Sequence, residues 1–218
     1  MRGCFISLEG SDGSGKSTVV EGLKKEAEKA GIAIDFTREP GGTPLAEKIR
    51  EIILDKENAE MDPRCEALLY AASRAQHTEE RILPHLEKGI HVFTERYVLS
   101  SLAYQGYGRK LGRDPVKMVN DFATRALEPD LILYLDVDPL KVLSRKGEEG
   151  EKDRLEEAGD DFFFRVKEGY EKEIAKSKNV VRINANQPPE KVIAEAWEAI
   201  KNLLEEKDEA AHLCRPGR

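Results

Sequence analysis

The chain has 218 residues, of which 39% are hydrophobic and 35% charged, and its formal net charge is −7. These values fit one globular domain of ordinary size, and the negative charge argues against a general nucleic-acid-binding surface. No apolar run reaches the ~18–20 residues that cross a membrane, and no secretory leader precedes the first strand-like run. Cys4, Cys65 and Cys214 lack metal-binding spacing, and their odd number suits a reducing compartment. We therefore expect a cytoplasmic protein.

Strands and helices are expected to alternate along the chain. Short apolar runs predict strands over residues 4–9, 32–37, 90–95, 131–137 and 180–183. Helical periodicity predicts helices over residues 17–30, 45–53, 62 to the mid-70s, 114–126, 163–170 and 189–204, with one more after 95–97. Further helix is expected before Pro84 or Gly89. An aspartate precedes a proline at Asp62, Asp114 and Asp138, a pattern typical of a helix start.

Several of these strands are apolar on both faces, which is typical of a parallel sheet covered by helices on both sides. We expect an α/β fold with a five-stranded parallel sheet, in a single domain over residues 1–204. The charged, aperiodic stretch at about 145–161 predicts a loop or lid. Residues 205–218 are polar and predict a flexible tail.

A glycine-rich loop between the first strand and the first helix matches the pattern G-x-x-x-x-G-K-[ST]. It consists of Gly10, Ser11, Asp12, Gly13, Ser14, Gly15, Lys16, Ser17 and Thr18. In such a loop backbone N–H groups converge on phosphate oxygens, Lys16 reaches the outer phosphates and Ser17 can offer its hydroxyl to Mg²⁺. The alternative is a glycine turn with an incidental lysine, which the flanking strand and helix disfavour. The motif therefore predicts nucleotide binding, but not the reaction.

A second anion site is expected at the same edge of the sheet. Arg38 follows the second strand and Arg96 follows the third, and ligands of open α/β sheets bind at the carboxyl ends of the strands. Tyr70 and Arg74 are four residues apart, so an aromatic ring and a guanidinium share one helix face. Taken singly, these residues also fit a surface loop, a Glu95–Arg96 ion pair or core packing. Together they indicate a mononucleotide pocket.

The chain resembles the thymidylate kinases, which transfer the γ-phosphoryl group of ATP to dTMP. The likeness runs from about Phe5 to Trp197 and is carried by EGSDGSGKST, FTREPGGTPLAEKIR, LLYAASRAQH, ERYVLSSLAYQG, PDLILYLDVDP and FFFRVKEGY. It implies a P-loop nucleoside monophosphate kinase-like fold, ATP as phosphoryl donor, Mg²⁺ as cofactor and a homodimer.

The resemblance also implies roles for single residues. Tyr70 corresponds to the aromatic that stacks on thymine, Arg74 to the residue that binds a thymine carbonyl, and Tyr104 to the ring beneath the deoxyribose. The full set implied for dTMP binding is Asp12, Arg38, Pro40, Tyr70, Arg74, Arg96, Ser101, Tyr104 and Gln105. Ser17 and Glu95 are implied for the metal, although similar enzymes usually carry Asp where this chain has Glu95.

Lys16, Arg96 and Arg154 are the residues expected to act in catalysis. The phosphate loop has no basic residue at positions 11–14, so the chain resembles the enzymes whose extra arginine lies in the lid. Arg154 fits that position, and Arg145 is the alternative. The acceptor phosphate is already ionised at neutral pH, so no general base is assigned.

Two other functions compete with this interpretation. One is a different nucleoside monophosphate kinase or a deoxynucleoside kinase, because the phosphate loop alone does not select the acceptor. The other is a nucleotide-binding module without catalysis, which would not need a second anion site. The arginines at positions 38, 74 and 96 argue against such a module.

Overall fold

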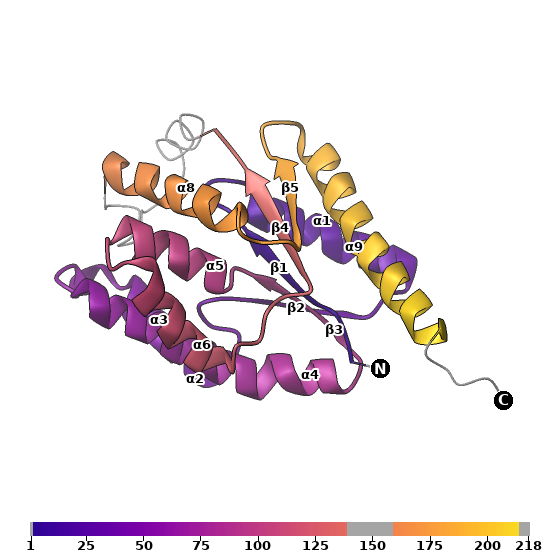
Figure 1. Cartoon of the computed structure of the whole chain (residues 1–218), viewed down its shortest axis with the longest axis horizontal. Coiled ribbons are helices and arrows are strands. Elements are labelled where there is room, and N and C mark those ends of the chain that lie inside the picture. The colour runs from indigo at the N-terminus through magenta and orange to yellow at the C-terminus, as the bar shows by residue number, and fades with distance from the viewer. Residues whose placement is uncertain (1, 139–158, 214–218) are drawn as a thin grey trace.

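The computed structural model describes residues 2–138 and 159–213. A five-stranded parallel sheet runs through it in the order β2-β3-β1-β4-β5 (Figure 1). The strands are β1 (Phe5–Glu9), β2 (Ile34–Arg38), β3 (His91–Glu95), β4 (Leu131–Asp136) and β5 (Val180–Asn184). The predicted five-stranded parallel sheet is confirmed, with strand ends that differ by at most two residues.

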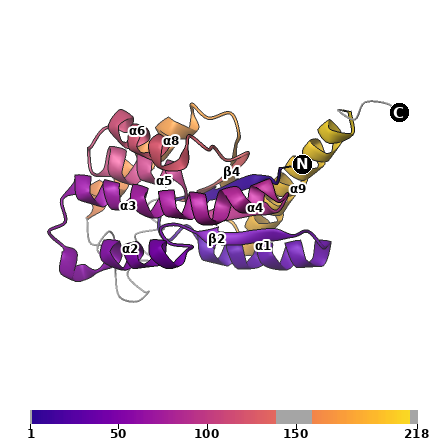
Figure 2. The ribbon, with the colours of Figure 1, turned by 90° about the horizontal axis from the view of Figure 1, so that it is seen from below.

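Helices cover both faces of this sheet, as predicted. They are α1 (Lys16–Ala30), α2 (Pro44–Leu54), α3 (Pro63–His77), α4 (Leu83–Glu87), α5 (Val98–Ser101), α6 (Arg113–Thr124), α8 (Asp160–Ile174) and α9 (Pro189–Leu213). Figure 2 shows α1 on one side of the sheet and α5, α6 and α8 on the other. None of the described helices is both long and apolar enough to span a membrane.

Strand β1 is buried on both faces because its side chains alternate between two cores. Ile6 and Leu8 pack with the apolar faces of α1 and α9. Phe5 points the other way and packs against Tyr97, with ring centroids 4.9 Å apart. The strand therefore anchors both layers of helices.

The register of the three strands β2, β3 and β1 brings their carboxyl ends level. Arg38 is paired with Glu95, and Leu8 is also paired with Glu95. The loops that follow these strands therefore leave the sheet side by side, which is where parallel sheets bind ligands.

The helical region before β3 agrees with one of the two predicted ends, before Gly89 and not before Pro84. Helix α3 continues through the π-helical segment η2 (Thr78–Ile82) into α4, which ends at Glu87, and Pro84 lies in the first turn of α4. A proline inside a regular α-helix removes a hydrogen bond and collides with the preceding turn. The wider π-turn, in which the Leu83 N–H bonds to the Thr78 carbonyl, accommodates it.

Other helix ends differ from the prediction. Helix α6 ends at Thr124, and Ala126, which was expected within it, has a left-handed φ of 53°. Helix α9 continues to Leu213, beyond the predicted end at residue 204. The residues that follow 204 are polar but are mostly strong helix formers, and Lys207 Nζ lies 3.0 Å from Asp130 Oδ1. Polarity alone was therefore a poor sign of a flexible tail.

The predicted lid lies almost entirely outside the described residues. Its expected range, 145–161, overlaps the start of α8 at Asp160, but Arg154 and Arg145 fall within 139–158. The helix expected to open at Asp138 falls there as well. The roles of these residues stay predictions.

Helices α1 and α9 approach each other closely at Gly22. A Cβ atom at this position would lie 2.4 Å from Cδ1, 2.7 Å from Cγ1 and 3.0 Å from Cγ2 of Ile193. Because Ile193 is β-branched, one χ1 rotation does not move all of these atoms away. The lack of a side chain at Gly22 therefore sets the distance between the two helices.

We predict that Gly22→Ala lowers the free energy of unfolding by about 1–3 kcal/mol, because the added methyl overpacks this contact. An alanine normally stabilises a helix interior by roughly 0.5–1 kcal/mol relative to glycine. In an Ile193→Ala background the same change should therefore become neutral or stabilising. Urea denaturation of the four proteins measures both effects, and an equal loss in both backgrounds would contradict this packing argument.

Candidate active site

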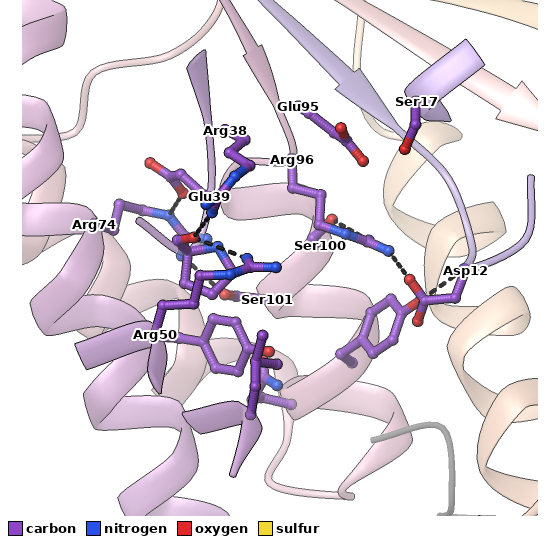
Figure 3. Close-up of a pocket in the computed structure, with 15 residues that line it drawn as sticks. Asp12, Ser17, Arg38, Glu39, Arg50, Arg74, Glu95, Arg96, Ser100 and Ser101 are labelled. Atoms are coloured by element: carbon purple, nitrogen blue, oxygen red, sulfur yellow. Dashed lines mark hydrogen bonds and ion pairs between the residues drawn. The ribbon is translucent and has the colours of Figure 1, made fainter. Parts of the chain in front are cut away.

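A cavity of about 250 Å³ opens at the carboxyl ends of β1, β2 and β3 (Figure 3). Every residue predicted to bind dTMP lines it, as do the two candidate metal ligands. The full lining is Asp12, Ser17, Arg38, Glu39, Pro40, Arg50, Leu54, Tyr70, Arg74, Glu95, Arg96, Ser100, Ser101, Tyr104 and Gln105. Of the phosphate loop, only Asp12 and Ser17 are part of this lining.

The phosphate loop holds its lysine against backbone oxygens. Lys16 is 6% exposed, and its Nζ donates to the carbonyls of Gly10 at 3.2 Å and Ser11 at 2.9 Å. Gly10 and Gly15 have φ values of 151° and 88°, which side chains other than glycine rarely adopt. Burial first, and the nearby Arg96 charge second, lower the pKa of Lys16 to about 8.

A charged cluster spans the cavity between β1 and β3. The Arg96 guanidinium donates to the Asp12 carboxylate, which also accepts from the Tyr104 hydroxyl at 2.8 Å. Tyr104 OH in turn accepts from the Asp12 backbone N–H at 3.1 Å. Burial is the largest single influence and opposes the Arg96 charge, but Asp12, Tyr104, Tyr170 and Glu95 together outweigh it and raise the pKa of Arg96 well above its usual value. Arg96 therefore faces the cavity as a fixed cation.

Two further arginines share one backbone acceptor. The Pro40 carbonyl accepts from Arg38 Nη1 at 2.9 Å and from Arg50 Nη1 at 3.0 Å. Arg38 also donates to Glu47 at 3.0 Å, so its head group is held at the mouth of the cavity. Arg50 was not predicted. The only signal for it was its place at the end of the segment FTREPGGTPLAEKIR, on the helix that follows the loop.

Arg74 is the most buried arginine of the cavity, and almost all of its N–H groups bond to other residues of the protein. Arg74 donates from Nε to Glu39 at 2.6 Å, from Nη1 to Ser101 at 2.8 Å and to the Asn120 side chain, and from Nη2 to the Tyr97 carbonyl at 3.1 Å. Within the described part of the chain, these bonds use four of its five N–H groups. The fifth N–H, on Nη2, is not used by these bonds, and Arg74 lines the cavity.

Glu39 holds Arg74 in place and was missed as a site residue. Its second oxygen bonds His77 Nδ1 at 2.9 Å, and His77 Nε2 bonds Thr37 Oγ1 at 2.8 Å. Burial alone would raise the pKa of Glu39, but the Arg74 and His77 groups outweigh it and lower this pKa. The sequence places Glu39 directly after Arg38, but gives no sign that it turns inward.

Two helical segments supply further residues of the cavity lining. Tyr70 and Arg74 on α3 both line it, so their predicted common face is confirmed. Tyr104 and Gln105 lie in a π-helical segment, η3 (Leu102–Gly108), which continues α5. Ser100 also lines the cavity.

Ser17 and Glu95 are the oxygen donors that suit a divalent cation. Figure 3 shows the hydroxyl and the carboxylate pointing toward one another at one end of the cavity. Among residues 2–138 and 159–213 there is no cluster of three or more His, Cys, Asp or Glu side chains that could hold a metal. Mg²⁺ that binds together with nucleotides uses one or two protein oxygens, phosphate oxygens and water. This pair fits that mode.

We predict that affinity for ATP falls as pH rises through the pKa of Lys16, which is about 8. Only the ammonium form attracts phosphate, so the dissociation constant should be flat below about pH 7.5 and rise ~30-fold by about pH 9.5. Arginines keep their charge over this range, so the KM for dTMP should change little. Titrating Mg–ATP binding across this range tests the prediction, and a constant affinity up to pH 9.5 would contradict it.

Comparison with known proteins assigns the family. A model of the family "Thymidylate kinase" matches residues 8–196. The chain is 48% identical to the thymidylate kinase of Finegoldia magna, with 90% of this chain and 97% of the relative covered. For the thymidylate kinase of Clostridium novyi the identity is 48%, covering 93% and 98%, and for that of Lactobacillus acidophilus it is 49%, covering 94% and 96%. The chain belongs to the thymidylate kinase family.

Proposed function

We propose that this protein transfers the γ-phosphoryl group of ATP to dTMP, giving dTDP and ADP. The observation that carries the proposal is one cavity that joins the phosphate loop to a second, arginine-rich anion site and to an aromatic–arginine pair. Family membership supports the same reaction. A nucleotide-binding module would not need the second anion site.

The acceptor phosphate would lie among the arginines at the open end. The Pro40 carbonyl accepts from both Arg38 and Arg50, and Arg96, whose guanidinium points toward Asp12, lines the same cavity (Figure 3). Phosphoryl transfer depends on positioning and on neutralising the charge of the phosphate oxygens. In this arrangement Arg96 binds the acceptor phosphate and stabilises the transferred group, while Lys16 binds the phosphates of ATP.

Ser17 and Glu95 are the residues that would hold Mg²⁺, the second through a carboxylate one methylene longer than the usual aspartate. When bound, Mg²⁺ supplies positive charge to the phosphates of ATP. The residues of the chain supply the orientation: Asp12 holds Arg96 by an ion pair, and the Gly10 carbonyl accepts from Arg96 Nη1 at 3.1 Å. The orientation of the Arg96 guanidinium is therefore fixed before the substrates bind.

The thymine base would lie at the closed end. Tyr70 supplies an aromatic face, and the remaining N–H of Arg74 is available to a base carbonyl. The sugar would lie between base and phosphate, against Tyr104. The Tyr104 ring is held at its hydroxyl, which donates to Asp12, and over one face, where the Arg96 guanidinium carbon lies 5.1 Å from the ring centroid.

We predict that the wild-type protein uses dTMP at least five- to a hundredfold better than ribothymidine 5′-monophosphate. A 2′-hydroxyl would collide with the Tyr104 ring and lose its hydrogen bonds, at a cost of roughly 1–3 kcal/mol. Tyr104→Phe keeps the ring and should keep this preference. Tyr104→Ala should reduce the preference for dTMP over the ribonucleotide. The measurement is kcat/KM of both acceptors in the three proteins.

Two results would contradict these assignments. If Tyr104→Ala discriminates as well as the wild type, the sugar is read by other residues. If dUMP, dCMP or dAMP is phosphorylated as well as dTMP by the wild type, the protein is a different nucleoside monophosphate kinase.

We also propose that the protein forms a homodimer through α3 and α6. Three large apolar side chains on these helices are exposed: Leu68 at 57%, Met118 at 72% and Phe122 at 90%. The two helices lie side by side (Figure 1), and exposed apolar side chains that gather on neighbouring helices are typical of an interface. A second copy of this chain is the partner that the family resemblance implies.

We predict that Phe122→Glu converts the dimer into a monomer of 24.5 kDa, because burying an unpaired carboxylate at an interface is costly. Phe164→Glu is the matched control, since Phe164 is also exposed, at 49%, but lies on α8. Sedimentation velocity should find a dimer for the wild type and for the control. A monomeric wild type, or a Phe122→Glu dimer, would refute the interface.

A further inference from the structure

A buried carboxylate lies behind the base end of the cavity without lining it. Glu66 on α3 is fully buried, and its Oε1 accepts from Gln105 Nε2 at 2.9 Å. The same carboxylate accepts from Arg109, from Nε at 3.2 Å and from Nη2 at 3.0 Å. Gln105 lies within η3, and Arg109 is the residue that follows its last position. Glu66 therefore ties α3 to the segment that carries Tyr104 and Gln105.

This contact fixes which way the Gln105 amide points. A carboxylate that is paired with a guanidinium accepts hydrogen bonds and donates none, so the atom of Gln105 that faces Glu66 is the NH₂ group. The amide oxygen is then the polar atom on the opposite side. Gln105 lines the cavity and Glu66 does not, so the oxygen is the group offered to a ligand.

The polarity of this arrangement matches thymine. N3 of thymine carries a hydrogen and lies between two carbonyls, whereas N3 of cytosine is an acceptor with an amino group beside it. The Gln105 oxygen accepts and the remaining Arg74 N–H donates, so the two side chains complement the N3–H and a neighbouring carbonyl of thymine. Cytosine would bring its N3 acceptor against the Gln105 oxygen, which leaves both groups without a hydrogen.

Arg109 maintains this polarity. Its guanidinium binds both oxygens of Glu66 and stacks on Phe162, with the guanidinium carbon 4.8 Å from the ring centroid. A buried carboxylate needs a cation and hydrogen bonds to remain charged, and a bidentate arginine provides both. The pair therefore keeps Glu66 as an acceptor, which in turn holds the NH₂ of Gln105.

We propose that Glu66, held by Arg109, is a positioning residue that orients the Gln105 amide oxygen toward the base and thereby sets the preference for thymine over cytosine monophosphates. This inference rests on the proposed dTMP kinase function and adds a determinant of its specificity. Glu66 does not line the cavity and contacts Gln105, which does, so its effect on the substrate is expected in base recognition and not in phosphoryl transfer.

The test is Glu66→Gln, in which an amide replaces the carboxylate with almost no change of shape. The amide at position 66 in this variant both donates and accepts, so the Gln105 amide can bind it in either orientation and can rotate between the two. We expect the KM for dTMP to rise about tenfold or more, while kcat at saturating dTMP stays within about threefold of wild type. The inhibition constant of dCMP against dTMP phosphorylation should stay equal or fall.

A matched control is Glu173→Gln. Glu173 is also buried and is held by an arginine, Arg113, at 3.0 Å, but it does not line the cavity. This variant should leave the KM for dTMP and the inhibition constant of dCMP unchanged. It separates loss of a buried ion pair in general from loss of the Glu66 contact.

A second variant keeps the proposal testable if Glu66→Gln does not fold. Gln105→Met removes the amide and leaves the Glu66–Arg109 pair in place, and should raise the KM for dTMP by a similar factor. The double variant Glu66→Gln/Gln105→Met should be no worse than Gln105→Met alone, since the two residues act in series.

Three results would overturn the proposal. They are an equal loss of affinity for dTMP and for dCMP in Glu66→Gln, an additive rise of the KM for dTMP in the double variant, and an unchanged preference for dTMP over dCMP in Gln105→Met. Absence of dTMP phosphorylation in the wild-type protein would instead refute the proposed function. The two failures are therefore distinguishable.

Discussion

The position of β1 in the centre of the sheet is the constraint on which the rest of the site depends. Because both faces of β1 are buried, its end is fixed relative to the helices on either side. The carbonyl of Gly10, directly after the strand, accepts from Lys16, Arg96 and the Tyr170 hydroxyl, the last at 3.3 Å. One backbone oxygen thus fixes the relative positions of groups from α1, the end of β3 and α8.

The cations of the site are held by anions and carbonyls of the protein itself. Arg96 is paired with Asp12 and Arg74 with Glu39, and Lys16 is held by two carbonyls. A buried cation without such partners would be strongly destabilising. The partners also fix direction, so that incoming phosphates meet charges that are already oriented and little reorganisation is required. Stability and pre-organisation are here achieved by the same contacts.

The sequence predicts the sheet and its helical cover because these follow from local patterns, whereas Ser101 and Gln105 were expected in the site only through the family resemblance. Apolar runs mark the strands, and the order of loops along a parallel sheet places Arg38 and Arg96 at one edge. Contacts between distant residues were not predictable in this way. Glu39 turns inward because His77 and Arg74 approach it from α3, and nothing near Glu39 in the sequence signals this.

Helix ends were the least predictable part of the fold. Pro84 is tolerated because the π-turn of η2 precedes it, and nothing in the local sequence signals that turn. Residues 205–213 were taken for a tail because they lack an apolar face, although their intrinsic helix propensity is high. At this end of α9, composition was given more weight than helix propensity.

The four protein bonds of Arg74 have a consequence for how base specificity can evolve in this protein. Replacing this arginine would leave Glu39, Ser101 and Asn120 without their shared partner, so a change made there disturbs α3, α5 and α6 together. A new preference for the base is therefore accessible only through neighbours that have fewer partners. Because Arg74 cannot be replaced without these losses, changes in base specificity are confined to the side chains around it.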